Sequence, residues 1–217
     1  MPDPLSPIQQ ISSQLERGLA WGQGHLHGAA VLIPLIHQPD GSIDVLFEQR
    51  SFDLERQPGE VCFPGGMIEA GEAPRQAALR ETCEELLISP QQVGLIGQLE
   101  RTVGPGGGAL WPFVGTLDGY EGSFQTDEVA RTFTVPLQWF LDHDPEVYEG
   151  KRVAVLPDGL PWELIPGGRS YPWAEVPYRI RFYRGTDPLV WGMTARVLQT
   201  FVELLKKGQC VTGDGSV

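Results

Sequence analysis

The chain has 217 residues, of which 41% are hydrophobic, and this composition suits a single globular domain, 1–217, with one core. Its formal net charge of −12 argues against a nucleic-acid partner, because binding to phosphate backbones requires a basic surface. No apolar run reaches the roughly 20 residues of a membrane span, and the three cysteines form no CxxC pair, so we expect a cytoplasmic protein with reduced thiols and no membrane partner.

The first half of the chain begins with a predicted amphipathic helix over about 6–19, where apolar residues fall on one stripe. Two apolar, β-branched segments follow at 29–36 and 43–48. The turn signal Gln-Pro-Asp-Gly at 38–41 lies between them and predicts a hairpin. A short strand is expected at 61–63.

The clearest helix spans 74–87, since proline suits its first turn and Ala, Leu, Glu and Arg dominate its interior. Strands are predicted at 94–103 and 111–117. The glycine-rich run between them, 104–108, is interpreted as a flexible connection, because no Gly-Lys-Ser/Thr follows it as in a phosphate-binding loop.

The last third of the chain is predicted to contain a short helix at 137–141 and an amphipathic helix at 194–207. Between 153 and 183, short β-like pieces alternate with Pro and Gly turns. Strands and helices mixed in this order indicate an α+β fold rather than a regular βαβ array.

Three glutamates crowd together in the helix predicted at 74–87. Helical spacing predicts a buried apolar stripe made of Leu79, Cys83 and Leu86. On another face, Glu81, Glu84 and Glu85 stand at i, i+3 and i+4 and repel one another. A divalent cation such as Mg²⁺ or Mn²⁺ would compensate this repulsion, whereas for an isolated run a solvated acidic face is the commoner explanation.

The residues around this cluster favour the metal. Gly66 opens the pattern G-x5-E-x7-R-E-x-x-E-E, which resembles the signature box of the Nudix hydrolases, here over 66–88. Two positions depart from the family pattern: Thr82 stands where an aliphatic residue is usual, and Leu87 where glycine is usual. Leucine resists the left-handed turn that glycine permits, so the geometry at the end of the helix is open to question.

The resemblance implies a Nudix α/β/α sandwich around a mixed sheet, and metal-dependent hydrolysis of a nucleoside diphosphate linked to another group. It implies Mg²⁺ or Mn²⁺ as cofactor, with Glu81, Glu84 and Glu85 as metal ligands. Arg80 would orient one of these ligands by a charge-assisted hydrogen bond. Glu72 would have a structural role, tying the loop to the helix.

Other site residues follow from the same resemblance. Gly65 and Gly66 would let the backbone approach the metal or a phosphate closely. The base that activates the attacking water would be either Glu85 or Glu128. Arg50 is a candidate for a phosphate contact, and a structural salt bridge is the alternative.

Residues 46–66, 111–115 and 190–198 resemble the coenzyme A diphosphatase branch of the family, which implies coenzyme A or its thioesters as substrate. The alternatives are hydrolysis of another nucleoside diphosphate, such as NADH or ADP-ribose, and a nucleotide-sensing module without activity. Glu55 and Gln57 replace the usual Arg and His of the branch, and loss of a basic residue at position 55 would weaken binding of the 3′-phosphate of coenzyme A.

The segment 148–175 and two of the cysteines belong to no motif. The segment 148–175 is longer than the branch requires. Its aromatic residues Trp162, Tyr171 and Trp173 suit either an aromatic wall for a base or acyl chain of the substrate, or an edge hairpin or homodimer contact. Cys62 and Cys83 are interpreted as small buried hydrophobic residues without a catalytic role.

Overall fold

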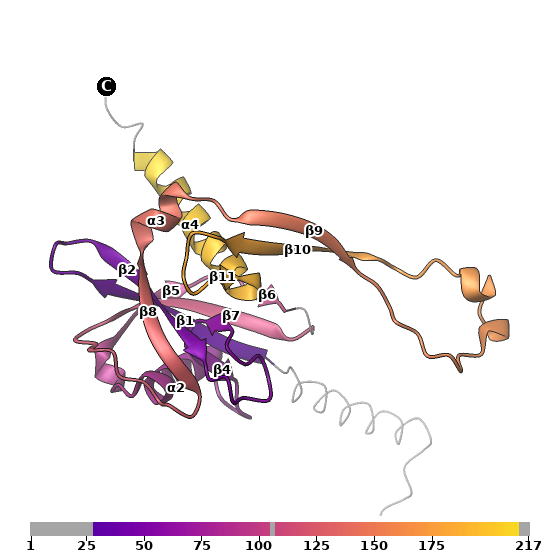
Figure 1. Cartoon of the computed structure of the whole chain (residues 1–217), viewed down its shortest axis with the longest axis horizontal. Helices are drawn as coiled ribbons and strands as arrows, with labels where there is room; N and C mark the ends of the chain where they lie inside the picture. Colours follow the sequence, from indigo (N-terminus) through magenta and orange to yellow (C-terminus); the bar gives the residue numbers. More distant parts are fainter. Residues whose placement is uncertain (1–27, 105–106, 213–217) are drawn as a thin grey trace, which may run out of the picture. The chain divides into compact units, whose positions relative to one another are not determined.

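The computed structural model describes residues 28–104 and 107–212 (Figure 1). The helix predicted at 6–19 lies outside these residues. The chain divides into two compact units, of which the first ends at Phe140 and the second begins at Leu141. The expectation of a single domain over 1–217 stays a prediction.

The first unit is built on a mixed sheet with the strand order β3-β2-β1-β7-β5, in which β4 also pairs with β1, β6 with β7, and β8 with β2. β1 and β7 run parallel, and the other pairs run antiparallel. The strands are β1 (Gly28–His37), β2 (Ile43–Arg50), β3 (Val61–Cys62), β4 (Gly65–Met67), β5 (Val93–Gln98), β6 (Thr102–Val103), β7 (Ala109–Leu117) and β8 (Val129–Pro136).

The predicted hairpin is confirmed as β1 and β2, and local chemistry explains its turn. The Ser42 backbone N–H and hydroxyl both donate to Asp40 Oδ1, while the Gly41 N–H donates to the Gln38 carbonyl. Gly41 has a φ of 86°, which favours glycine. These contacts set the register in which Leu35 faces Val45.

Helix α2 (Pro74–Leu86) confirms the predicted helix and packs against β1, β4 and β7 (Figure 1). Its predicted buried stripe was only partly right, because Leu86 is fully buried whereas Leu79 and Cys83 are half-buried. The face on the sheet is formed instead by Ala77, Ala78, Thr82, Glu85 and Leu86. Small alanines let this face approach the strands closely, and the helix is therefore rotated relative to the apolar stripe.

Some strands differ from the prediction. The single strand expected at 94–103 is interrupted, so β5 and β6 are separate and each pairs with β7. Four strands were not predicted. β4 and β11 (Val190–Trp191) have only three and two residues, β8 carries exposed polar or charged residues at Arg131 and Thr134, and β9 (Glu146–Arg152) is exposed along its whole length. The α+β class with a mixed sheet is confirmed.

The second unit contains a smaller antiparallel sheet with the order β11-β10-β9, against which helix α4 packs through β10 and β11. The predicted short helix is confirmed as α3 (Leu137–Asp142), which spans the boundary of the two units, and the C-terminal helix is longer than expected. The remaining elements are β9 (Glu146–Arg152), η2 (Trp162–Leu164), η3 (Gly168–Ser170), β10 (Val176–Tyr183), β11 (Val190–Trp191) and α4 (Gly192–Thr212).

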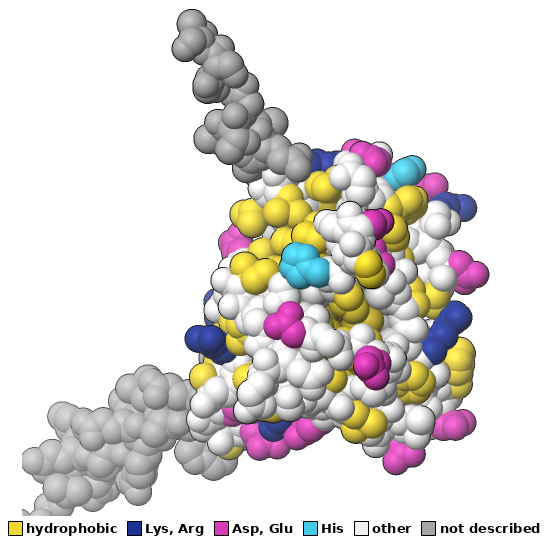
Figure 2. Space-filling model, turned by 90° about the vertical axis from the view of Figure 1, so that its left-hand side faces the viewer, with side chains coloured by type: hydrophobic (Ala, Val, Ile, Leu, Met, Phe, Trp, Pro, Cys, Tyr) yellow, Lys and Arg dark blue, Asp and Glu magenta, His cyan; other side chains and the backbone are white. Residues whose placement is uncertain are grey.

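The β9–β10 ribbon continues into a long connection that carries η2 and η3 (Figure 1). Every residue of β9 is exposed, and apolar side chains of the connection, Val155 and Leu164 among them, are also exposed. On the face shown in Figure 2, acidic and basic side chains are interspersed with apolar ones. Among the residues that the structure describes, no helix combines the length and apolar character needed to cross a membrane.

Candidate active site

Two consecutive glycines in β4 bring the backbone against the sheet and against helix α2. A Cβ atom on Gly65 would lie 2.3 Å from the Ala30 carbonyl oxygen, and the φ of Gly65 is 148°. A Cβ atom on Gly66 would lie 2.4 Å from Cδ of Glu81. Side chains at these two positions would therefore displace either the strand or a carboxylate of the acidic cluster.

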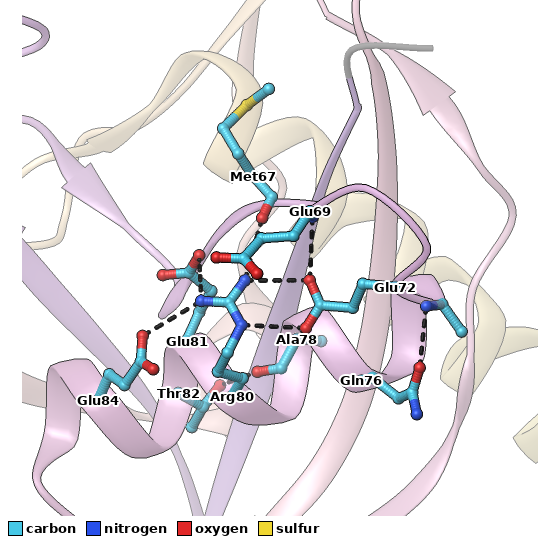
Figure 3. A network of polar contacts seen from close by, with 10 residues as sticks. Met67, Glu69, Glu72, Gln76, Ala78, Arg80, Glu81, Thr82 and Glu84 are labelled. Carbon is cyan, nitrogen blue, oxygen red and sulfur yellow. Dashed lines mark hydrogen bonds and ion pairs between the residues drawn. The ribbon is translucent and has the colours of Figure 1, made fainter. Parts of the chain in front are cut away.

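Arg80 organises the polar contacts on the outer side of α2 (Figure 3). Its guanidinium donates through Nε to Glu72 Oε1 at 3.0 Å and through Nη2 to Glu72 Oε2 at 3.1 Å. Nη1 donates to Glu81 Oε1 at 2.9 Å and to Glu84 Oε2 at 3.2 Å. Glu72 also accepts from the Glu69 N–H, so it joins the loop to the helix as expected.

These contacts have the expected effect on ionisation. The hydrogen bond from Arg80 lowers the pKa of Glu72, and the bonds to Glu72 and Glu81 raise the pKa of Arg80. Both groups are therefore charged at neutral pH. The guanidinium stabilises one conformation of the glutamates around it, because a charge-assisted bidentate contact fixes direction as well as distance.

The three glutamates of the predicted cluster lie in three different environments. Glu84 is exposed, Glu81 is half-buried and Glu85 is buried with 4% exposure, so the expectation of one shared acidic face was wrong for Glu85. Glu85 Oε2 accepts from the Gly65 N–H at 2.7 Å. Burial and the neighbouring charge of Glu48 raise the pKa of Glu85 to about 9, although the Gly65 bond acts in the opposite direction.

Glu48 is a site residue that the sequence analysis missed. It lies on β2 with 1% exposure, and the Cys62 thiol on the adjacent β3 donates to its Oε1 at 3.2 Å. Burial raises the pKa of Glu48 to about 7. The available signal was an acid that directly follows the apolar run Val45 to Phe47, since Leu46 and Glu48 point to the same face by strand alternation.

Cys62 is therefore more than a small hydrophobic residue, because its thiol holds a carboxylate. Burial and the charge of Glu48 raise the pKa of this thiol, which keeps it protonated as a donor. Burial also raises the pKa of the half-buried Cys83. Neither thiol has the lowered pKa of a catalytic cysteine, and this agrees with the expectation that both are non-catalytic.

Glu128, one of the predicted residues, approaches the cluster from the turn before β8. Glu128 is exposed, and its backbone carbonyl accepts from the Ser51 N–H at 2.7 Å. The charge of Glu128 raises the pKa of Glu48, Glu81 and Glu85, so its carboxylate lies within electrostatic reach of all three.

Arg50 lies at the end of β2 and is half-buried. Its backbone N–H donates to the Glu60 carbonyl, whereas its side-chain Nε is buried without a hydrogen-bond partner among the described residues. Its positive charge lowers the pKa of Glu48 and of Cys62. The structure thus places a guanidinium with a free donor beside the buried carboxylates.

The donor chemistry fits a hard divalent cation. Within residues 28–104 and 107–212, no three His, Cys, Asp or Glu side chains converge in a ready metal-ligand group. The contacts give the reason, since Arg80 holds Glu81 and Glu84 while Glu85 turns to Gly65. The carboxylates nevertheless raise one another's pKa, and a cation bound among them would relieve that repulsion.

Comparison with known proteins identifies the family. The NUDIX domain model matches residues 26–155. The peroxisomal coenzyme A diphosphatase NUDT7 of Mus musculus is 39% identical over 126 residues, which cover 57% of this chain and 52% of that protein, so the match spans about half of that relative. The uncharacterized Nudix hydrolase NudL of Salmonella newport is 36% identical over 173 residues, or 79% of each chain.

Solved structures give a weaker likeness. An Ap4A hydrolase of C. elegans is 24% identical, covers 51% of this chain and 80% of its own, and has a TM-score of 0.44. The match to the NUDIX domain model and the similarity to NudL show the family without this structural likeness. The chain belongs to the Nudix hydrolase family.

Proposed function

We propose that this Nudix hydrolase cleaves the diphosphate bond of coenzyme A or its thioesters, and that it releases 3′,5′-ADP and 4′-phosphopantetheine from coenzyme A. The observation that carries the proposal is the 39% identity over 126 residues with a mouse protein named as a coenzyme A diphosphatase. The motif residues at 46–66 support the same substrate. Nudix hydrolases generally use divalent metal ions, and we propose Mg²⁺ or Mn²⁺ here.

The proposal gives the acidic residues separate roles. Glu81, Glu84 and Glu85 hold the cation, which neutralises charge on the diphosphate when it is bound. Arg80 positions Glu81 and Glu84 through the contacts of its Nη1. The proton of the attacking water passes to either Glu85 or Glu128. The charge of Glu128 raises the pKa of Glu85, which supports a position of Glu128 near enough to the buried carboxylates for either residue to act as the base.

Substrate phosphates would meet the free donors of the site. Arg50 has a buried Nε without a partner in the described residues, which supports a phosphate contact. Gly65 and Gly66 leave no room for a side chain at β4, because the Ala30 backbone and the Glu81 carboxylate lie against them, so the backbone of β4 closely approaches one of the proposed metal ligands. We expect Arg50→Lys to raise KM more than it lowers kcat, because lysine keeps the charge but loses the directed Nε–H.

A substrate panel tests the proposal. Coenzyme A, acetyl-coenzyme A, dephospho-coenzyme A, NADH and ADP-ribose are assayed with Mg²⁺ and with Mn²⁺, and kcat/KM is compared. We expect the coenzyme A compounds to have the highest values. Preference for NADH or ADP-ribose would favour the alternative substrate class, and tight binding without hydrolysis would indicate a nucleotide-sensing module. A Glu81→Gln enzyme prepared in parallel controls for contaminating phosphatases.

Glu55 makes a sharper test of the substrate. It is exposed in the loop after β2, where the related branch usually has arginine. If this position lies near the 3′-phosphate, the wild type should discriminate poorly between coenzyme A and dephospho-coenzyme A, and Glu55→Arg should shift the kcat/KM ratio toward coenzyme A. Glu100→Arg, the same charge change at another exposed position, should leave the ratio unchanged. A wild type that already prefers coenzyme A strongly, with no shift in Glu55→Arg, would contradict this placement.

The proposal also includes a cytoplasmic location and a homodimer. The exposed apolar side chains in the segment 148–175 support a contact between copies of the chain. Light scattering of the purified chain measures its mass in solution, and cell fractionation measures its location. A monomer at micromolar concentration would remove the dimer from the proposal without affecting the substrate.

A further inference from the structure

Glu48 is buried, and its hydrogen bonds do not offset the cost of burying a carboxylate. The side chain has 1% exposure, its Oε1 accepts from the Cys62 thiol at 3.2 Å, and its carboxyl group also meets that of Glu85. Its Oε2 is buried without a hydrogen-bond partner among the described residues unless the Glu85 carboxyl is protonated and donates to it. Buried polar atoms in native proteins are nearly always paired, so an unpaired carboxylate oxygen points to a ligand that satisfies it.

The position of Glu48 is set by the sheet. In the pairing of β2 with β3, Glu48 lies opposite Cys62, which places the thiol against the carboxylate. Strand alternation puts Leu46 and Glu48 on one face of β2, and a register shift against β8 falls between Gln49 and Arg50. Leu46 on that face belongs to the same core cluster as Leu86 of α2, so this face of β2 is turned toward α2, where Glu85 is buried.

The free oxygen of Glu48 is accompanied by a free donor. Arg50 Nε at the end of the same strand is also buried without a partner in the part of the chain described here. The two groups would satisfy each other if Glu48 had a purely structural role as an ion pair. An acceptor for a cation and a donor for an anion, each unpaired and within electrostatic reach of the other, match a cation–phosphate ligand instead.

We propose that Glu48 is a further ligand of the divalent cation, reaching the site from β2 beside Glu85, and that the Cys62 thiol is the positioning residue that orients its carboxylate. This inference rests on the metal site of the proposed function. Mg²⁺ is usually held through one or two carboxylates, with water and substrate phosphates completing its octahedron. Glu48 and Glu85 can therefore supply the buried side of the site without a third converging ligand.

Binding of Mn²⁺ to the full chain without substrate tests the inference, with free Mn²⁺ measured by electron paramagnetic resonance. Glu48→Gln should weaken Mn²⁺ binding by about 10-fold or more. Asp44→Asn removes one carboxylate from the other end of the same strand and should bind as the wild type does. Cys62→Ser keeps a donor and should bind nearly normally, whereas Cys62→Ala should bind more weakly, because it leaves Glu48 without its orienting contact.

Thermal unfolding without metal provides a readout that is independent of binding. Glu48→Gln should keep or raise the Tm of the metal-free protein, since it removes an uncompensated buried charge. A lower Tm together with unchanged Mn²⁺ affinity would show a structural role and overturn the inference. If Glu48→Gln does not fold, Glu48→Asp carries the same test, because it keeps the charge but withdraws the carboxylate, and unchanged binding would again overturn it.

The outcomes separate this inference from the proposed function. Absence of Mn²⁺ binding by the wild type would overturn both. Loss of binding in Glu85→Gln with normal binding in Glu48→Gln would leave the metal site in place and overturn only the role of Glu48.

Discussion

At the residue scale, the distinctive feature of this chain is a pair of buried glutamates, one on a strand and one on a helix. Glu48 and Glu85 both have raised pKa values, about 7 and about 9, and burial is the main cause for each. Such groups reduce stability when they ionise without a compensating cation. A bound cation would compensate these charges, so the residues that lower the stability of the metal-free protein are the ones proposed to hold the metal.

Replacing Glu85 by glutamine should separate these two effects. The folded-state pKa of Glu85 is raised to about 9 from an ordinary value of 4.5, so the folded protein holds the proton more tightly than the unfolded chain does. In the metal-free protein this contribution to stability is fully present below pH 4.5 and is lost as the pH rises toward 9. At pH 8, Glu85→Gln should therefore raise the free energy of unfolding by at least about 1 kcal/mol, measured by urea unfolding.

The same variant should lose hydrolysis, with kcat reduced by on the order of 100-fold or more, because a metal-facing charge and a candidate base are removed together. Glu84→Gln is the matched control for stability, since Glu84 is exposed and its removal should change the free energy of unfolding little. Near-normal turnover of Glu85→Gln in saturating Mg²⁺ would show that this residue is not part of the machinery.

The two glycines of β4 should respond differently to alanine. At Gly66 the added Cβ meets the end of the flexible Glu81 side chain, so Gly66→Ala should fold with a modest loss of stability but bind Mn²⁺ more weakly. At Gly65 the added Cβ meets the backbone of Ala30, and we expect a loss of several kcal/mol. Urea unfolding and Mn²⁺ binding distinguish the two cases. Equal stability losses in both variants would contradict this interpretation.

At the scale of the elements, the end of helix α2 is formed by a residue that disfavours the geometry it adopts. Leu87 has φ 52° and ψ 45°, in the left-handed region, and the Ile88 N–H donates to the Cys83 carbonyl at 3.1 Å. The helix thus ends as it would with glycine, at a cost of roughly 1 kcal/mol for the leucine. Thr82, the other departure from the family pattern, is buried and satisfies its hydroxyl by donating to the Ala78 carbonyl at 2.7 Å.

Leu87→Gly should therefore stabilise the protein by about 1 kcal/mol. Leu87 is 59% exposed, so little packing is lost in the exchange. Leu87→Ala serves as the control, because alanine keeps the Cβ atom and the strain while it also shortens the side chain. The free energy of unfolding in urea measures both variants, and a destabilised Leu87→Gly would show that packing of the leucine outweighs the strain.

Across the whole molecule, the proposed metal site would link cation binding to folding. A cation that binds only the folded protein stabilises it by about 2.7 kcal/mol at 100 times its Kd. Protons would compete with the cation at Glu48 and Glu85, whose raised pKa values keep them partly protonated near neutral pH.

We accordingly expect Mg²⁺ or Mn²⁺ to raise the Tm, and to raise it more at pH 8.5 than at pH 6, both values chosen to bracket the titration of the two carboxyls. Thermal unfolding is followed with each metal and with EDTA at both pH values. A shift in Tm that is equal at the two pH values, or larger at the lower one, would show that these carboxyls do not hold the metal.

Features that depend on local chemistry could be predicted from the amino-acid sequence. The Asp40–Gly41 turn predicts the hairpin of β1 and β2, and the composition of 74–87 predicts α2 almost to its ends. The spacing of the motif residues from Gly66 to Glu85 resembles the family pattern. The closeness of its glutamates can be predicted too, because a helix places residues three and four apart at neighbouring positions whatever surrounds it. These inferences need no knowledge of which elements pack together.

Which carboxylates are buried, and which groups they contact, depends on the tertiary structure. Leu79 and Cys83 continue the apolar pattern of α2, yet the helix turns Thr82 and Glu85 to the sheet, because Ala77 and Ala78 allow the closest approach to the strands. Glu48 is 37 positions before Glu85 in the sequence, and only the tertiary fold buries both acids within electrostatic reach of each other. Burial is a property of the packed molecule, and burial is what raises the pKa of these two groups.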